Sequence, residues 1–302
     1  MLWHQDKSSA VIVPLIFSFV NSYNMLNSDI MGFMQDKTSV YYRILEEICQ
    51  EDGINLTWLS SDWLAQLDKA GVRRRILGYK ADLNPAASTL VADDKYATYE
   101  VLRNEEVPVI EHVMLYEAGN CNTYVEGRNT PEYIAEYFTK NNNHIVIKPN
   151  AGQCGRGISQ ITSLTQIPTV LEEVFKQSFS ASMCPFYKIE HEYRVVMLDG
   201  EARLAYQKNR GNDWRFNLSQ GATASQVTNT ELLNRLIELA KRAVVAMGLR
   251  FCSVDIVEVA GDLMIIEINS GVTIMHYLEQ FPDDYEKVKA IYRDVVQKMF
   301  AE

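Results

Sequence analysis

The chain has 302 residues, a length that predicts two or three packed subdomains rather than one small core. Hydrophobic residues make up 47 % and charged residues 23 %, which excludes long disordered stretches. The net charge of −10 disfavours non-specific attraction to phosphate backbones, and the sequence contains no basic run long enough to suggest a nucleic-acid partner.

Two features of the sequence predict a cytoplasmic protein with no membrane partner. The five cysteines are odd in number and widely spaced, which argues against a disulfide framework or a structural zinc site. The apolar segment Ala10–Val20 has about half the length needed to cross a bilayer, and no small-residue cleavage site follows it. We therefore expect a buried parallel strand there rather than a signal peptide.

The N-terminal part of the chain predicts an α/β unit. Val40–Glu51 has the pattern of an amphipathic helix that ends before Gly53, and Asn55–Leu59 has the pattern of a short strand. This alternation of strand, helix and strand is typical of a parallel sheet. The following residues are harder to assign. We interpret the basic triplet at 73–75 as a solvated face, with binding of an acidic substrate as the alternative.

The middle of the chain predicts a helix and then a strand pair joined by a glycine-rich connection. An aspartate pair at 93–94 starts a helix over Lys95–Asn104, because aspartate accepts hydrogen bonds from the free N–H groups of a first turn. His144–Lys148 has a strand pattern that Pro149 ends, and Ser159–Thr162 has the pattern of the return strand.

The C-terminal part of the chain alternates between helices and strands. Asp199-Gly200 between two alternating runs predicts a tight hairpin turn. In chain order, we expect a helix near Ile167–Gln177, a hairpin over Tyr193–Tyr206, a polar loop over Asn209–Ala224, a helix over Glu231–Met247 that stops at Gly248, strands over Cys252–Val259 and Leu263–Asn269, and a helix over Asp284–Phe300.

Acidic residues on two neighbouring strands are the strongest chemical signal. Glu267 and Asn269 lie on the same face of one strand, and a three-residue connection at 260–262 would place Asp255 directly opposite Glu267. Facing carboxylates repel, and a divalent cation removes that penalty. Oxygen ligands without thiols or imidazoles suit Mg²⁺. The alternative, ordinary solvated charges, is disfavoured by the apolar residues that flank them in both strands.

Two further groups of residues are suited to binding phosphate. The strand-end Lys148 precedes Gly152, Gly155 and Gly157, and such glycines let backbone N–H groups approach phosphate oxygens. This is not a Walker A loop, and a plain surface turn is an equally good interpretation of it alone.

The other group is basic: Arg194, Lys208 and Arg215, with Asn217 nearby, could neutralise a transferring γ-phosphate, or could be ordinary surface charges. The sequence has no arrangement typical of a nucleophilic hydrolase.

Taken in order, these pieces resemble the ATP-grasp superfamily, most closely its RimK-like branch of ribosomal-protein S6 glutamate ligases and lysine-biosynthesis ligases. The resemblance covers 93–269 clearly and the preceding residues loosely. It implies a mixed α/β (α+β) fold with an N-terminal α/β domain over 1–92, a central lid domain over 93–182 and a C-terminal domain over 183–302. In this fold, ATP is expected between the last two domains.

The resemblance also implies a role for each matching residue. Lys95 and Lys148 would contact ATP phosphates. A hinge at 184–188 with Phe186 and Tyr187 would hold the adenine, and Glu192 would bind the ribose. Catalytic roles fall to Arg194, Lys208 and Arg215, contacts with ATP to Gly152, Gly155, Gly157 and Asn217, and metal ligation to Asp255, Glu267 and Asn269.

The sequence departs from the family pattern at two places. Relatives often have an acid at the start of the hinge, where this chain has Pro185 and Phe186. After Asn269 close relatives often have Ala-Ser-Pro-Gly, whereas this chain continues with Ser270-Gly271-Val272. That loop commonly lies near the acceptor, so the acceptor cannot be copied from a relative.

These observations predict an ATP-dependent ligase that joins a carboxylate to an amine through an acyl phosphate. We expect ATP and Mg²⁺ as cofactors, with room for two ions and for Mn²⁺ in their place. The expected partners are an amino acid or short peptide and other copies of the chain. Two alternatives stay open: an ATP-grasp kinase that phosphorylates a small molecule, and a non-catalytic ATP-binding module.

Overall fold

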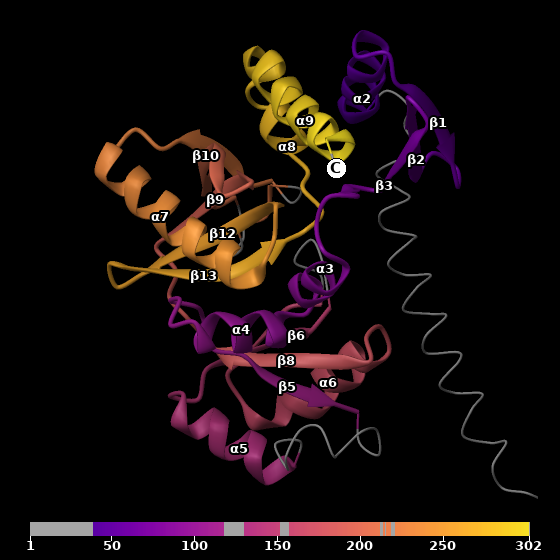
Figure 1. The fold of residues 1–302 in the computed structure, drawn as a ribbon. Coiled ribbons are helices and arrows are strands. Elements are labelled where there is room, and N and C mark those ends of the chain that lie inside the picture. Colours follow the sequence, from indigo (N-terminus) through magenta and orange to yellow (C-terminus); the bar gives the residue numbers. More distant parts are fainter. Residues whose placement is uncertain are drawn as a thin grey trace, which may run out of the picture. The chain divides into compact units, whose positions relative to one another are not determined.

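A computed structural model describes residues 39–117, 130–151, 157–211, 214, 216–218 and 221–301 (Figure 1). The described residues form two compact units, one within 112–186 and the other from 39–111 together with 187–301. The strand predicted at Ala10–Val20 lies outside the described residues. The predicted division into domains at 1–92, 93–182 and 183–302 stays a prediction.

The unit within 112–186 is built on an antiparallel sheet whose described strands have the order β5-β8-β6-β7. Its core joins the sheet to two helices through buried side chains such as Leu115, Phe138 and Ile147. Its elements are β5 (Val113–Tyr116), α5 (Pro131–Lys140), β6 (Ile145–Pro149), β7 (Ser159–Ile161), a 3₁₀ turn (Leu164–Gln166), α6 (Ile167–Phe175) and β8 (Ser180–Pro185).

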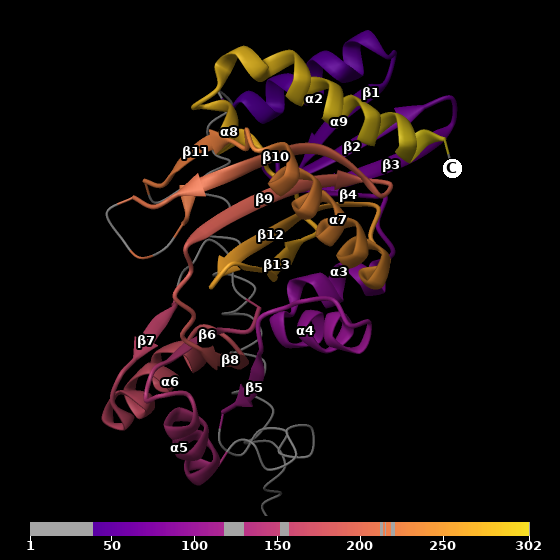
Figure 2. The ribbon, with the colours of Figure 1, turned by 90° about the vertical axis from the view of Figure 1, so that its left-hand side faces the viewer.

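The larger unit contains a second antiparallel sheet, in which the described strands have the order β11-β10-β9-β12-β13. These strands are β9 (His191–Leu198), β10 (Glu201–Asn209), β11 (Thr223–Gln226), β12 (Phe251–Val259) and β13 (Asp262–Asn269). Helix α7 (Thr230–Met247) lies across one face of this sheet (Figure 2). Its buried side chains, including Leu236 and Ala240, pack against Val195, Val254 and Ile268 of the strands.

Two positive-φ glycines end elements where the sequence predicts an end. Asp199 and Gly200 have φ values of 49° and 78°, as the tight hairpin turn between β9 and β10 requires. Gly248 has a φ of 62° and ends α7, because a residue without Cβ adopts this left-handed conformation at little cost. The predicted hairpin and the predicted end of the long helix are therefore confirmed.

The N-terminal part of the larger unit forms a separate antiparallel sheet. The predicted parallel pairing of Asn55–Leu59 involves Ala10–Val20, which lies outside the described residues, and it stays a prediction. The described strands β1 (Asn55–Leu59), β2 (Leu64–Lys69), β3 (Val72–Leu77) and β4 (Lys80–Ala81) pair antiparallel, in chain order. The turn between β2 and β3 explains why, since Lys69 pairs with Val72 across only Ala70 and Gly71. A connection this short joins antiparallel neighbours, whereas a parallel pair needs a long crossover.

Helices complete the larger unit. The helix α9 (Tyr285–Phe300) packs beside α2 (Val40–Glu51), and the Lys289 ammonium bridges Glu47 and Glu51 at 2.6 and 2.7 Å (Figure 1). The sequence predicts α2, α4 (Lys95–Asn104) and α9 but misses α3 (Ala86–Asp93), α5 and α8 (Met275–Leu278); a 3₁₀ turn at Pro282–Asp284 precedes α9. In the described part of the chain, none of the helices has the length and apolar composition needed to span a bilayer.

The packing of α7 on the sheet is testable with two substitutions on one helix. Leu236 is fully buried, and we expect Leu236→Ala to lower the free energy of unfolding by about 2–5 kcal/mol, because it leaves a cavity under the helix. Val245 is 78 % exposed, so Val245→Ala should change that free energy by less than about 0.5 kcal/mol. Urea unfolding followed by circular dichroism measures both, and equal effects would contradict the packing described.

Candidate functional site

The sheet with the strand order β11-β10-β9-β12-β13 has an apolar face and a charged face. Along β12, Val254 and Ile256 belong to the core under α7, so Asp255 between them lies on the opposite face. The same alternation places Arg194 of β9 away from α7, because its neighbours Tyr193 and Val195 belong to that core. We refer to the side of the sheet opposite α7 as the charged face. The charged residues that meet near its centre are Glu192, Arg194, Lys208, Asp255 and Glu267.

Cross-strand pairing brings the charged residues together in rows. One row runs from Tyr206 of β10 through Arg194 and Asp255 to Glu267 of β13, each residue opposite the next. The next row pairs Lys208 with Glu192. Directly opposite residues on one face have Cβ atoms within about 5.5 Å of each other, so these side chains meet whatever their distance in the sequence.

The predicted position of Asp255 opposite Glu267 is confirmed, but by a different route. The prediction assumes a three-residue connection, whereas Val259 pairs with Asp262 across the two residues Ala260 and Gly261. That turn alone would place Asp255 opposite Ile266. A β-bulge beside Asp255 shifts the register by one residue and so restores the pairing with Glu267.

A buried ion network occupies the centre of the charged face. The Arg194 guanidinium binds Asp255 through two hydrogen bonds of 2.7 Å each, from Nε to Oδ1 and from Nη2 to Oδ2. The Lys208 ammonium lies 2.6 Å from Oε1 of Glu192 and 3.1 Å from Oδ1 of Asp255. The side chains of Asp255 and Lys208 are only 5 % and 6 % exposed, so little water reaches the charges.

The network sets the charge states of its members. Burial alone would raise the pKa of the Asp255 carboxyl, but the charges of Arg194 and Lys208 outweigh burial and hold that pKa at about 2. Burial raises the pKa of the Glu192 carboxyl, although Lys208 opposes the shift. Burial and Arg194 oppose the charge on Lys208, yet Asp255 and Glu192 together raise its pKa. Asp255 is therefore an anion, with two cations beside it, throughout the physiological range.

Glu267 also has a cationic neighbour. The Lys95 ammonium lies 3.7 Å from Oε1 of Glu267, and Lys95 is the first residue of α4. Asp94 fixes the start of this helix, since its carboxylate accepts a 2.8 Å hydrogen bond from the backbone N–H of Ala97. The predicted mutual repulsion of Asp255 and Glu267 is thus offset by cationic side chains of the protein itself, which the sequence argument did not foresee.

The chemistry of the donor set fits Mg²⁺. Asp255, Glu267 and Asn269 project from one face of neighbouring strands and offer only oxygen ligands. The described residues hold no group of three or more His, Cys, Asp and Glu side chains that could bind a metal by themselves. Such a set suits an ion that keeps water and phosphate oxygens in its shell, as Mg²⁺ does. The metal assignment stays a prediction.

The residue after Asn269 connects the charged face to the N-terminal elements. The Ser270 hydroxyl donates a 3.3 Å hydrogen bond to Asp93 at the end of α3, and Asp93 forms an ion pair with Lys80 of β4. The backbone N–H of Val272 donates to the carbonyl of Tyr79 at 3.2 Å. From the sequence alone, Asp93 is predicted only to start a helix. The hydrogen bond between Ser270 and Asp93 joins residues far apart in the chain, and no local sequence pattern predicts it.

In the smaller unit, Lys148 lies on β6 directly opposite Ser182 of β8, and both residues are buried. The Ser182 hydroxyl in turn lies 2.6 Å from Nδ1 of His112, a buried polar pair that the sequence analysis missed. Gly157 has a φ of 65°, and a Cβ there would lie 3.1 Å from Cγ of Pro149, so this position requires glycine. The predicted phosphate contacts Gly152 and Gly155 lie outside the described residues.

The predicted hinge residues have structural partners. The Phe186 ring stacks on His144 with the ring centres 3.8 Å apart, and its backbone N–H donates to the His144 carbonyl. The Tyr187 hydroxyl accepts a 3.4 Å hydrogen bond from the backbone N–H of Glu111. Of the remaining predictions, Asn217 accepts a backbone bond from Ala222, and Arg215 lies outside the described residues. Binding roles for these residues stay predictions.

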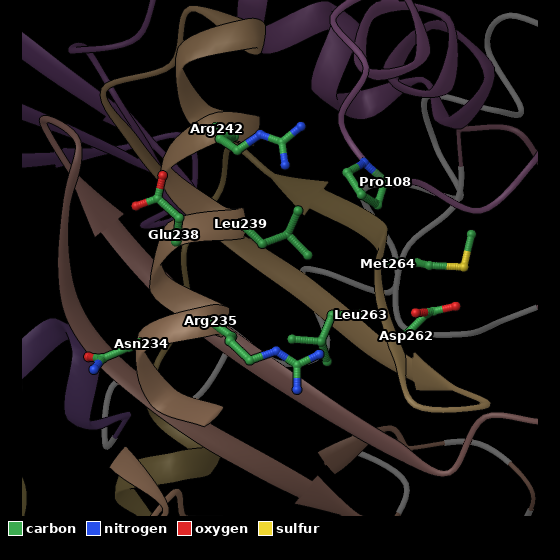
Figure 3. A pocket seen from close by; sticks show the side chains of 9 residues that line it. All are labelled: Pro108, Asn234, Arg235, Glu238, Leu239, Arg242, Asp262, Leu263 and Met264. Carbon is green, nitrogen blue, oxygen red and sulfur yellow. The ribbon is translucent and has the colours of Figure 1, made fainter. Parts of the chain in front are cut away.

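An open hollow of about 790 Å³ lies between α7 and the strand β13 (Figure 3). Arg235, Glu238 and Arg242 of α7 line one side of it, and Leu263 and Met264 of β13 line the other. Neither Asp255 nor Glu267 lines this hollow. We do not assign the charged-face chemistry to this hollow.

The ion network makes a prediction about stability and pH. Asp255→Asn should lower the free energy of unfolding at pH 7 by on the order of 3–5 kcal/mol, because Arg194 and Lys208 remain buried without their anion. The pKa of Asp255 is depressed in the folded protein, so its contribution is present above the ordinary aspartate value of about 4 and is lost as the pH falls toward 2. The gap between the variant and the wild type should therefore narrow below about pH 4.

Urea unfolding at pH 7, 5, 4 and 3 measures this gap. Asp262→Asn is the matched control, because Asp262 is exposed at the start of β13 and its replacement should leave the stability unchanged at each pH. A gap for Asp255→Asn that stays constant from pH 5 to pH 3 would show that this carboxylate is not the charged partner of Arg194.

Comparisons with known proteins agree with this geometry. The model of the RimK-like ATP-grasp domain family matches residues 92–283. Tetrahydromethanopterin:alpha-L-glutamate ligase of Methanocaldococcus jannaschii is 29 % identical over 132 residues, which are 41 % of this chain and 44 % of that protein. The match thus spans less than half the length of this curated relative.

Solved structures of two ligases share the fold. D-alanine–D-alanine ligase of Bacillus anthracis, complexed with ATP, has a TM-score of 0.56 at 16 % identity, covering 72 % of this chain and 69 % of that chain. A bifunctional glutathione synthetase of Pasteurella multocida has a TM-score of 0.52 at 15 % identity, covering 86 % and 43 %. The family match extends over more than half of the chain and includes every member of the charged face, so this chain belongs to the RimK-like ATP-grasp family.

Proposed function

We propose that this protein is an ATP-dependent ligase that joins a carboxylate to an amine through an acyl phosphate. The observation that carries the proposal is the charged face. It gathers two cationic side chains and three oxygen ligands on neighbouring strands, and all of them lie within the residues matched by the family. An arrangement of this kind suits a nucleotide whose phosphates arrive with a divalent cation.

The reaction requires charge stabilisation more than a covalent group on the protein. In the proposed first step, a carboxylate oxygen of the substrate attacks the γ-phosphorus of ATP, and the bond from that phosphorus to the β-γ bridging oxygen breaks to release ADP. We propose that the Arg194 guanidinium and the Lys208 ammonium, which bind Asp255 in the structure, donate hydrogen bonds to the transferring group. Mg²⁺, when bound by Asp255, Glu267 and Asn269, would supply further neutralisation of the phosphate charge.

In the second step the amine attacks the acyl carbon, phosphate leaves with its bridging oxygen, and the nitrogen loses a proton to give the amide. The protein's contribution here is to position the two reactants and to keep out water, which would hydrolyse the acyl phosphate. Lys95 beside Glu267 is a further cation at this end of the charged face, and we propose that it contacts phosphate.

The other predicted contacts rest on the family match and stay part of the proposal. We assign phosphate binding to Lys148 and the glycine-rich connection, adenine binding to Phe186 and Tyr187, and ribose binding to Glu192. The Glu192 carboxylate already binds Lys208 at 2.6 Å, so a ribose hydroxyl would have to share it. We propose an amino acid or short peptide as a substrate, because the similar ligases are named for glutamate, D-alanine and glutathione.

Release of ADP tests the proposal. The wild-type protein, with ATP and Mg²⁺, is screened against pooled amino acids and small carboxylic acids, and mass spectrometry identifies any amide formed. Glu267→Gln should reduce the ADP release rate by at least about 100-fold, since it removes a charged ligand at the site of phosphoryl transfer. Glu201→Gln is the control, because that side chain is 77 % exposed on the same sheet and should leave the rate unchanged.

The screen separates the proposed ligase from the other two interpretations. A phosphorylated product that accumulates and needs no amine would identify a small-molecule kinase. ATP binding without turnover over the whole panel would identify a binding module. Near-normal ADP release by Glu267→Gln would show that the metal assignment is wrong.

A further inference from the structure

We propose that Arg194 and Lys208 keep Asp255 from binding a divalent cation until nucleotide phosphate arrives, so that cation and nucleotide bind only together. This inference rests on the proposed function and adds to it an order of events on the charged face.

Both carboxylate oxygens of Asp255 are engaged by the Arg194 guanidinium at 2.7 Å, and Oδ1 also lies 3.1 Å from Nζ of Lys208. A cation that binds Asp255 directly must displace at least one of these donors. The paired, parallel N–H groups of arginine make this a strong hydrogen-bonded arrangement rather than a loose surface contact.

Charge balance also opposes a divalent cation bound alone. The charged residues that meet near the centre of the charged face, together with Lys95, comprise three carboxylates, Glu192, Asp255 and Glu267, and three cations, Lys95, Arg194 and Lys208, so the net charge of this group is zero. A divalent cation alone would make this partly buried group doubly positive. It would also leave the Arg194 guanidinium without its carboxylate in a place where its side chain is only 19 % exposed.

A bound nucleotide changes both the charge and the hydrogen-bond acceptors on the charged face. A triphosphate brings several negative charges, and its oxygens are good acceptors for a guanidinium and an ammonium. Arg194 and Lys208 can then turn from Asp255 to phosphate while the cation takes their place at the carboxylate. Lys208 keeps a second anion throughout, since Glu192 binds it at 2.6 Å. Binding of the cation and binding of the phosphate thus each remove the cost of the other.

Mn²⁺ is the probe for the test, because the spectrum of the free ion reports binding by electron paramagnetic resonance. Wild-type protein is titrated with Mn²⁺ alone. A fluorescent ADP analogue is then titrated with and without Mn²⁺. We expect weak Mn²⁺ binding without nucleotide and an affinity for the analogue that Mn²⁺ raises by at least about tenfold.

Substitutions at Arg194 separate charge from hydrogen bonding. Arg194→Met should raise the affinity for Mn²⁺ alone by about tenfold and reduce the dependence on nucleotide, because it frees both oxygens of Asp255. Arg194→Lys keeps the charge but cannot make the paired bonds, so it should give a smaller gain in the same direction. If Arg194→Met folds poorly, Arg194→Lys still tests the inference, because it keeps a cation beside Asp255.

Arg250→Met is the matched control. Arg250 makes the same kind of paired hydrogen bonds, at 2.7 and 3.1 Å, with Asp199. Asp199 lies on the turn between β9 and β10, outside the charged face. Its replacement should leave Mn²⁺ binding unchanged. Glu267→Gln should abolish the gain that Arg194→Met produces, which assigns the bound ion to the charged face.

The outcomes distinguish this inference from the proposed function. Wild-type protein that binds Mn²⁺ through Glu267 equally well with and without nucleotide would overturn the inference and leave the ligase proposal standing. Unchanged Mn²⁺ binding in both Arg194 variants would also overturn it. If neither Mn²⁺ nor the ADP analogue binds, both the inference and the proposed function fail.

Discussion

The arrangement of the larger unit's charged face depends on the pair of hydrogen bonds between Arg194 and Asp255. Each residue is charged and mostly buried, and a buried charge is tolerated only beside an opposite charge and with its hydrogen bonds satisfied. The pair joins β9 to β12 at the middle of the sheet, and it sets the position of Lys208 and Glu192 in the next row. A change in the register of either strand by one residue would bury these charges under α7.

The same strands serve stability and chemistry through their two faces. Residues of one parity in β9 and β12, such as Val195 and Val254, form the core with α7, and residues of the other parity form the charged face. The helix therefore supports the charged residues through the core on the opposite face of the same strands. A loss of packing under α7 would loosen the rows of charge as well, since the charged residues sit on the strands that α7 packs against.

The sequence predicts most of the individual helices, strands and turns, but it does not predict the contacts between segments that are far apart in the chain. Periodicity and terminal residues predict α7, the turn at Asp199-Gly200 and the two strands that carry Asp255 and Glu267, because each signal lies within a few neighbouring residues. The Arg194–Asp255 pair was not predicted, since it depends on β9 and β12 being neighbours across 61 positions.

The β-bulge near Asp255 is a second feature that the sequence does not predict. Counting residues through the turn gives the correct partner for Asp255 only because the connection was assumed one residue too long, and the extra residue sits in β13 instead. No residue type in Ile265-Ile266-Glu267 marks a bulge, because two isoleucines fit an ordinary buried strand equally well. The pairing of Asp255 with Glu267 could be predicted by assuming that the two carboxylates share a metal ion, but it could not be predicted from the strand pattern.

The loop that follows the proposed metal ligands shows how the N-terminal elements can influence this site within one unit. Ser270 and Val272 are held by Asp93 and Tyr79, which come from α3 and from the residue before β4. A Cβ on Gly271 would lie 3.3 Å from Cγ of Lys80, so the loop packs closely against that side chain. This loop is also where the sequence departs from the pattern of its relatives. A side chain at position 271 would require Lys80 to shift, so residues outside the matched family region, such as Lys80, contact the loop at the end of the site next to Asn269.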